Sequence, residues 1–351
     1  MKKNLLIGLL LICLASVSLA AKPEKSLKKT PAAVPAAIGS DGCVPTRITS
    51  ETVSIPGFMR KTNLSGSLRV RYTFNEAANQ PDSFSLSRAR IKLTADIAPN
   101  MLFLIQPDFA GLSTGGTVAM ADAYVEMKFP ALYLNNLKVG QFLVPFAYDS
   151  AKYKTIYGTG LNPTYYNTMV SARDYGMRVM GAVPYLTGFY YDGAIVNGAG
   201  TADTNKTKDL CGRLNYKNNF MDVCLSGYLG AAGTASAETS KKDIGLYVEW
   251  NNMPYQVIAE YVLGQNIAAS AKVQDSYIQA TCLVASFEPL VRYEIYDPNT
   301  AVTGNIVNTL IIGGSCQMNR DSKLVLNYNI VGEETTQINN NVLLLELQTL
   351  I

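Results

Sequence analysis

Nine basic side chains recur on one face of a series of predicted strands, where they could attract anions. A guanidinium group holds phosphate or carboxylate through two hydrogen bonds, and a basic wall raises the local anion concentration. The alternative is that these cations pair across the strands with acidic residues of the same face, among them Asp122, Glu249 and Glu294. Six of the nine lie on the first four predicted strands. The nine residues are Arg69, Arg71, Arg88, Arg90, Lys92, Lys128, Arg178, Arg213 and Arg292.

Catalytic chemistry is restricted by the absence of histidine from all 351 residues. A Ser–His or Cys–His nucleophile, a His general base and a His-ligated metal are therefore excluded. We expect no enzyme activity, no cofactor, no metal site and no nucleic-acid partner. Residues 59–351 are close to neutral overall, so any ion selectivity must come from where the charges sit.

The N-terminus has the features of a Sec signal peptide. Lys2 and Lys3 precede an apolar run from Leu5 to Leu14, and Ser18-Leu19-Ala20 forms a cleavage site of the small-x-small type. The residues that follow are polar and interrupted by prolines, which predicts a flexible periplasmic linker. The predicted divisions are a signal peptide at 1–20, the linker at 21–58 and a transmembrane β-barrel at 59–351.

Period-two alternation begins at Leu64 and continues along the chain. Segments 68–74, 88–97, 121–129 and 243–250 each combine an apolar face with a polar or charged one. This is typical of strands that have lipid on one side and water on the other, although some soluble antiparallel sheets share it. No apolar run after residue 20 is long enough for a membrane helix, and apart from helices only closed barrels satisfy their backbone groups in lipid.

Short turns and longer loops alternate between the predicted strands, as in outer-membrane barrels. The even strand count allows the sheet to close, and a barrel of this size leaves a water-filled lumen. We therefore predict an all-β, antiparallel up-and-down barrel of about sixteen strands, placed in the bacterial outer membrane in contact with its lipids. The expected strands are 64–74, 84–97, 101–110, 120–129, 136–142, 173–183, 186–197, 208–217, 220–230, 242–251, 254–263, 273–285, 288–297, 305–318, 322–331 and 341–351.

The longest predicted loop runs from Leu143 to Ala172. Such a long connection in a regular barrel is usually functional, and folded into the lumen it would narrow the pore. Its tyrosines could stack on sugars or anchor the loop, and its two lysines could contact anions at the constriction. The candidates are Tyr148, Lys152, Tyr153 and Lys154.

Two cysteines flank one predicted hairpin. Equal steps from a turn centred on Lys217-Asn218 place Cys211 opposite Cys224, which predicts either a cross-strand disulfide in the oxidising periplasm or two small free thiols.

Several short segments together resemble the phosphate-selective porin family, the O and P porins. The resemblance implies a trimeric sixteen-stranded channel with loop three folded inward and a ladder of lumen arginines that guides anions. The segments are Leu86–Ile91, Lys138–Phe142 with Pro145-Phe146, Arg173–Gly176, Asn197-Gly198, and Arg292-Tyr293 with Asp297-Pro298.

The function expected from the sequence is passive diffusion of small hydrophilic solutes, with a preference for anions and phosphate as one candidate. Two alternatives stay open. The first is a general or sugar-preferring porin without anion selectivity, and the second is a structural or adhesive outer-membrane barrel.

Overall fold

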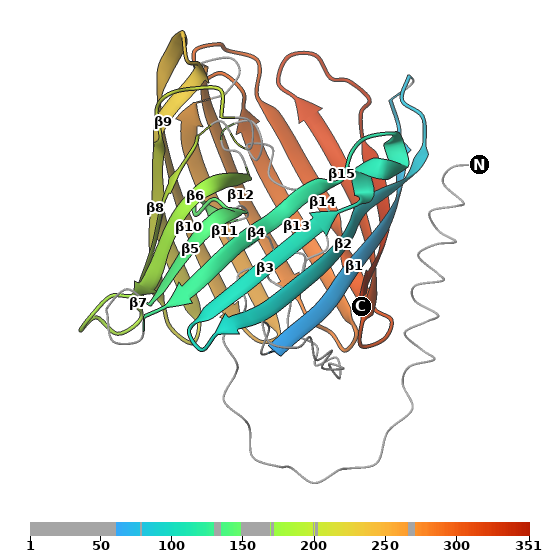
Figure 1. The fold of residues 1–351 in the computed structure, drawn as a ribbon. Helices are drawn as coiled ribbons and strands as arrows, with labels where there is room; N and C mark the ends of the chain where they lie inside the picture. Colours follow the sequence, from blue (N-terminus) through green and yellow to red (C-terminus); the bar gives the residue numbers. More distant parts are fainter. Residues whose placement is uncertain are drawn as a thin grey trace.

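The computed structural model describes residues 61–77, 79–129, 135–148, 169, 172–198, 200, 203–265 and 271–351. These residues form sixteen antiparallel strands that close into a barrel, in which β1 pairs with both β2 and β16 (Figure 1). The predicted sixteen-stranded barrel is confirmed. The strands are β1 Lys61–Asn75, β2 Ser83–Ala98, β3 Met101–Asp108, β4 Ala119–Lys128, β5 Asn136–Leu143, β6 Arg173–Ala182, β7 Phe189–Val196, β8 Asp209–Lys217, β9 Met221–Thr234, β10 Ala237–Asn252, β11 Tyr255–Gln265, β12 Lys272–Cys282, β13 Phe287–Asp297, β14 Val307–Gln317, β15 Ser322–Glu333 and β16 Val342–Leu350.

A single turn of 3₁₀ helix, η1 (Ala110–Thr114), interrupts the connection between β3 and β4. No helix in the described part of the chain is long and apolar enough to cross a membrane.

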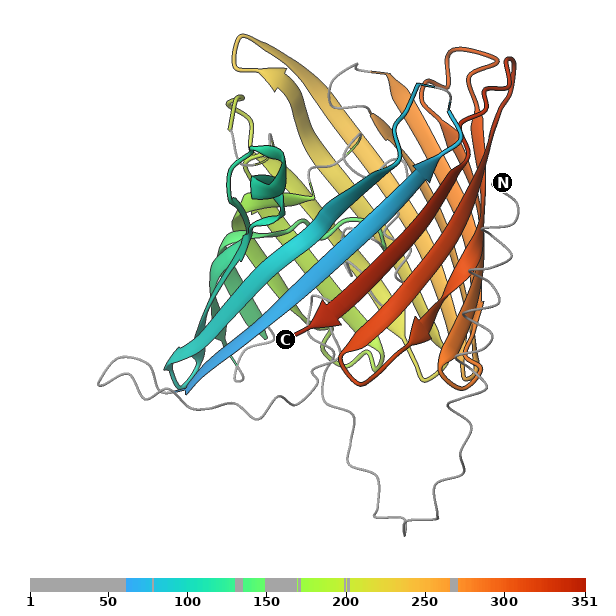
Figure 2. The same ribbon diagram turned by 90° about the vertical axis from the view of Figure 1, so that its right-hand side faces the viewer.

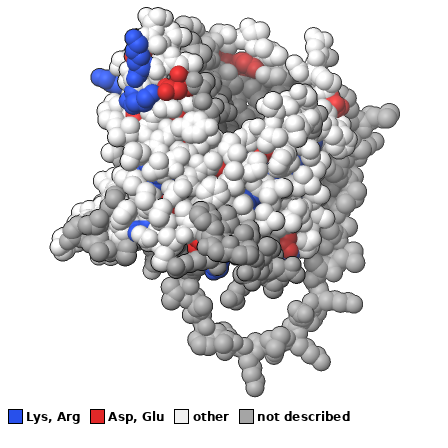
Figure 3. Space-filling model, viewed as in Figure 1, with Lys and Arg blue, Asp and Glu red and all other residues white. Residues whose placement is uncertain are grey.

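Polar residues lie inside the barrel and apolar residues lie outside. Along β10, Asp243, Tyr247 and Glu249 are buried, whereas Ile244 and Leu246 between them are exposed. This arrangement is the reverse of that in a water-soluble sheet, and it is stable when the outer face contacts hydrocarbon. Most of the outer wall visible in Figure 3 carries no charged side chain.

The barrel closes where its first and last strands meet. Their register runs from Ser67 opposite Leu350 to Asn75 opposite Val342, and Figure 2 shows the two strands side by side, inclined to the barrel axis. Backbone hydrogen bonds of 2.7 Å and 2.9 Å between Gly66 and Ile351 extend the ladder past β16. Closure removes the free sheet edges that lipid could not satisfy.

Candidate pore and its charged lining

The inner face of the closing seam carries arginines around one buried carboxylate, Glu346. Arg71 lies opposite Glu346 in the register, and Arg69 lies opposite Gln348. The Arg71 Nη2 is 2.8 Å from Glu346 Oε2, and the Ser87 hydroxyl on β2 donates to the same oxygen at 2.6 Å. One carboxylate therefore ties together β1, β2 and β16.

Two more arginines, Arg88 and Arg90, continue this basic surface along β2. Arg88 is buried directly opposite Arg69. Arg90 Nε donates to Asp108 Oδ2 on β3 at 2.6 Å. Two arginines that lie directly opposite each other place two positive charges side by side on this part of the lumen wall. Such like charges repel each other.

The wall of β4 to β6 combines cations with carboxylates. Arg173 donates twice to Asp122, at 3.1 Å and 3.2 Å. Lys138 lies 3.5 Å from Glu126, and its ammonium group is 4.6 Å from the centroid of the Tyr124 ring. These contacts neutralise part of the positive charge of this wall.

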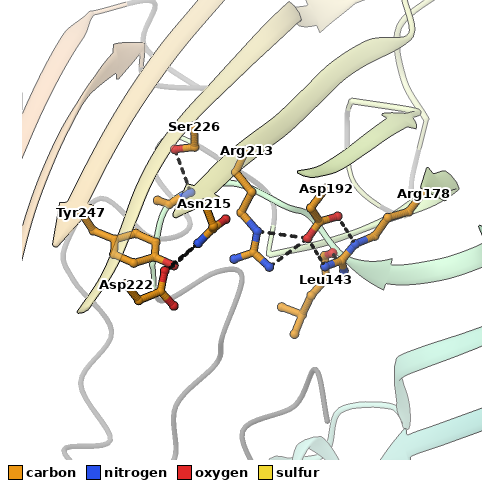
Figure 4. Close-up of polar contacts among 9 residues, drawn as sticks. Leu143, Arg178, Asp192, Arg213, Asn215, Asp222, Ser226 and Tyr247 are labelled. Carbon is orange, nitrogen blue, oxygen red and sulfur yellow. Dashed lines mark hydrogen bonds and ion pairs between the residues drawn. The ribbon is translucent and has the colours of Figure 1, made fainter. Parts of the chain in front are cut away.

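Asp192 on β7 holds two guanidinium groups at once (Figure 4). Arg178 on β6 donates to its two oxygens at 2.8 Å and 2.7 Å, and Arg213 on β8 donates to Oδ2 at 3.0 Å and 2.8 Å. Arg178 also donates to the carbonyl oxygen of Leu143 at 2.8 Å, at the end of β5. The trio carries a net charge of about +1 and fixes the start of the long β5–β6 connection.

The chain that leaves β5 contacts the wall on the far side. The Ala147 amide donates to the Ser226 hydroxyl on β9 at 3.2 Å, and the Tyr148 amide donates to Glu260 on β11. The ring of Tyr148 lies edge-on to that of Tyr247 on β10, with centroids 4.9 Å apart. These residues are almost fully buried, so this first part of the connection is anchored to β9–β11 by hydrogen bonds and aromatic packing.

Carboxylates dominate the far wall. Glu249 accepts from Gln256 at 2.6 Å, and Asp222 accepts from Asn215 at 2.9 Å. A cation on this wall is closely paired: Lys241 Nζ lies 3.2 Å from Asp243 Oδ2. The lumen is therefore lined with both signs of charge, in unequal proportions on its two sides.

The comparisons with known proteins agree with this architecture. Residues 63–245, just over half of the chain, match the family described as phosphate-selective porin O and P. The chain belongs to this porin family. Together with the fold, this indicates a channel in the outer membrane.

Solved porins share the barrel at low sequence identity. An anion-selective porin from Comamonas acidovorans is 15% identical, with a TM-score of 0.66 over 83% of this chain and 99% of that chain. OmpF of Salmonella typhi, in complex with daunomycin, is 10% identical, with a TM-score of 0.64 over 83% and 98%. The trimer form of OmpT from Vibrio cholerae is 10% identical, with a TM-score of 0.59 over 83% and 99%. No curated protein sequence matches the chain.

The predicted cations of the porin lie on the inner face, and many of them have acidic partners. Arg69, Arg88 and Lys92 share the inner face of β1 and β2, and Lys128 is exposed at the end of β4. Ion pairs with carboxylates engage Arg71, Arg90, Arg178, Arg213 and Arg292.

Only one of the four constriction candidates can be placed. Tyr148 is buried against Tyr247, whereas Lys152, Tyr153 and Lys154 lie outside the described residues.

Of the two alternatives predicted for Cys211 and Cys224, a cross-strand disulfide or two thiols, the structure has two buried thiols that form no disulfide. Cys211 lies opposite Tyr228 and Cys224 lies opposite Asn215, so the predicted register was wrong by four residues. The turn is wider than predicted, since the last pair before it is Lys217 with Asp222.

Lining residues that sequence reasoning missed include Lys138, Arg173 and Lys241. Lys138 and Arg173 stand within segments that resemble the porin family, and Lys241 alternates in phase with the inward Asp243. Phase alone would have found Lys138 and Lys241, whereas Arg173 is in phase with the outward Tyr175 and Met177 of β6 and would have been placed on the outer face. Their partners depend on register and could not have been assigned.

Proposed function

We propose that this porin is a passive diffusion channel that prefers small anions. The observation that carries the preference is the group of arginines on the inner face of β1 and β2, where Arg69 and Arg88 lie directly opposite each other. The solved anion-selective porin with the same barrel supports the proposal. Cations that are not fully neutralised raise the anion concentration beside them and lower that of cations.

A general porin without anion selectivity is the second candidate, and the ion pairs favour it. A guanidinium group that is paired with a carboxylate, such as Arg71 with Glu346 or Arg90 with Asp108, contributes less positive potential to the pore. The selectivity then depends on the remaining excess of positive charge on β1 and β2.

Reversal potential in a planar bilayer under a KCl gradient separates these two candidates. If the channel prefers anions, the zero-current voltage shifts towards the chloride equilibrium potential. A zero-current voltage of zero, or one shifted towards the potassium equilibrium potential, contradicts the proposal. Arg88→Glu and Arg90→Glu, made singly, should each shift selectivity towards cations. Lys242→Glu is the matched control, because Lys242 is exposed on the outward face of β10 and undergoes the same change of charge.

Phosphate as a preferred solute is tested in the same bilayers. Phosphate that binds the arginine surface should reduce the chloride current at millimolar concentration, and Arg88→Glu should remove this block. If sulfate and phosphate reduce the current equally, the channel selects by charge and not for phosphate.

We also infer that the β5–β6 connection continues inside the lumen and sets the size limit. The anchoring of Ala147 and Tyr148 to β9–β11 supports this. Uptake of neutral sugars of increasing size into proteoliposomes measures the limit.

Assembly as a homotrimer is proposed from the solved trimer of the similar OmpT. Light scattering of the detergent complex should give three chains. The proposed Sec signal peptide predicts that the mature protein begins at Ala21, which N-terminal sequencing checks.

A further inference from the structure

A groove with a volume of about 500 Å³ crosses the outer face of the barrel over β7, β8 and β9. Its floor is formed by three glycines that lie opposite one another in the register, Gly193, Gly212 and Gly227. Bulky residues border the floor in two parallel rows. The row nearer the long loops is Ile195, Leu210 and Leu229, and the row nearer the short turns is Tyr191, Leu214 and Leu225.

Aromatic residues mark this side of the barrel as facing lipid. The rings of Phe189 and Tyr216 are in contact below the groove, with centroids 5.0 Å apart, and Trp250 and Tyr255 are exposed at the same short-turn end of the next two strands, β10 and β11. Tyrosine and tryptophan concentrate at the boundary of the hydrocarbon layer. Gly212 lies four residues beyond Tyr216, about 13 Å along the strand, so the groove opens into the acyl chains.

Lysines gather at the long-loop edge of the same surface. Lys242 on β10 lies directly opposite Leu229, which borders the groove. Lys206 and Lys208 are exposed in the connection that leads into β8, and Figure 3 shows basic side chains at the upper left, where β8–β10 reach the loops. Two acidic residues lie among them, Asp203 and Glu238: Asp203 pairs with Lys208 at 2.9 Å.

The carboxylate of Glu238 already accepts hydrogen bonds from the loop that leads into β8. It accepts a hydrogen bond from the Thr207 hydroxyl at 2.7 Å and bonds from the amides of Lys206 and Thr207. Lys242 has no carboxylate partner among the described residues.

We propose that this groove binds one acyl chain of an anionic membrane lipid while Lys242 holds its phosphate headgroup. The apolar floor and walls fit a hydrocarbon chain, and a lysine stem can extend its ammonium group to the headgroup level. A second copy of the chain fits less well, since burying Lys242 against protein without an acidic partner is costly. The inference rests on the barrel spanning the membrane and is independent of the anion preference of the pore.

The test is native mass spectrometry of the whole protein in detergent, with dioleoyl phosphatidylglycerol and dioleoyl phosphatidylcholine as probes. The protein should bind the anionic lipid about fivefold more tightly, the effect of one lysine near an anionic headgroup. Lys242→Gln should remove this preference. Lys272→Gln is the matched control, because Lys272 is also exposed at the long-loop end, two strands further along.

A second variant tests the groove itself. A Cβ at Gly227 would meet no atom within 4 Å, so Gly227→Leu should fold normally and fill the groove. It should weaken binding of both lipids by about tenfold, the effect of losing two buried methylene groups. Ala259→Leu adds the same kind of bulk on the outer face of β11 and should leave binding unchanged.

Three results would overturn the proposal: equal binding of the two lipids by the native protein, an unchanged preference in Lys242→Gln, or unchanged binding in Gly227→Leu. If Gly227→Leu still binds both lipids but no longer forms an oligomer in the mass spectrum, the groove is a contact with a second copy of the chain. A cation-selective reversal potential would refute the anion preference and leave the lipid site intact.

Discussion

Replacing Asp192 with Asn should increase the anion selectivity of the pore. In the native protein one carboxylate is shared by Arg178 and Arg213, at distances between 2.7 Å and 3.0 Å. The substitution removes the negative charge and nearly keeps the side-chain volume. The net charge of the trio therefore rises from about +1 to about +2.

The size of the effect follows from Coulomb's law. One unit charge acting on an ion about 7 Å away in water contributes about 0.6 kcal/mol, which screening in 0.1 M salt halves to about 0.3 kcal/mol. Chloride is then enriched about 1.7-fold and potassium depleted by the same factor. The permeability ratio of chloride to potassium should rise about threefold in 0.1 M KCl and about fivefold in 0.01 M KCl, where the Debye length is longer.

Reversal potentials at the two salt concentrations measure this ratio. The double variant Asp192→Asn with Arg213→Gln restores the native net charge and should restore the native selectivity. Because Arg178 is almost fully buried, Asp192→Asn should also lower the free energy of unfolding by about 3–5 kcal/mol, and heat-modifiable gel migration checks that the barrel forms. An unchanged ratio in the folded single variant, or a double variant that stays as selective as the single one, would refute the reasoning.

Three further predictions follow from the contacts. Glu346→Ala should lower the free energy of unfolding by about 3 kcal/mol, which is the low end for a broken buried pair because the Arg71 side chain is still 21% exposed. Urea unfolding in lipid vesicles measures this loss, and a loss below about 1 kcal/mol would show that Glu346 does not stabilise the closure of the barrel. Tyr148→Ala removes an aromatic contact that anchors the β5–β6 connection, so single-channel current should become larger or noisier; a native trace would mean that this anchor does not affect the pore. Cys211 and Cys224 should both react with a thiol reagent after denaturation without reductant. Unmodified cysteines and a protein mass lower by two hydrogen atoms than that of the reduced chain would reveal a disulfide that the structure lacks.

Fold prediction succeeded because two simple properties of the sequence report directly on the environment. Alternation with period two places one face in lipid, and an even number of strands can close without a free edge. The largest errors in the predicted strand limits lie between β9 and β10, where β9 continues to Thr234 and not only to residue 230, and β10 begins at Ala237 and not at residue 242. Smaller errors occur at the short turns. The segment from Val183 to Gly188 forms a longer turn than expected, and β7 begins only at Phe189.

The cysteine error has a physical cause in the turn after β8. The Asn218 side chain accepts hydrogen bonds from the amides of Phe220 and Met221 at 2.9 Å and 2.8 Å. This side chain holds a wider turn than the two-residue one assumed and moves every later residue of β9 along the register. Asn is common in turns for this reason, but the sequence does not specify which of several turn lengths it stabilises.

Acidic partners were also beyond sequence reasoning, because side chains reach diagonally across the sheet. Asp192 lies opposite Met180 in the β6–β7 register, yet it pairs with Arg178, two residues away. Such diagonal neighbours remain within reach of long side chains. Phase predicts that both residues face the lumen, whereas their pairing needs the register and the direction of each side chain.

Charge of opposite sign lines the two halves of the pore, and this explains how a nearly neutral barrel can be selective. Strands eight apart in a sixteen-stranded ring face each other, so β1 and β2 lie across the lumen from β9 and β10. Neutralising a carboxylate on the far wall and a guanidinium on the near wall should therefore move the reversal potential in opposite directions, even though the total charge is small. The near wall carries Lys61, Arg69, Arg71, Arg88, Arg90 and Lys92 against Asp96, whereas β9 and β10 carry Asp222, Asp243 and Glu249 against Lys241 on their inner faces.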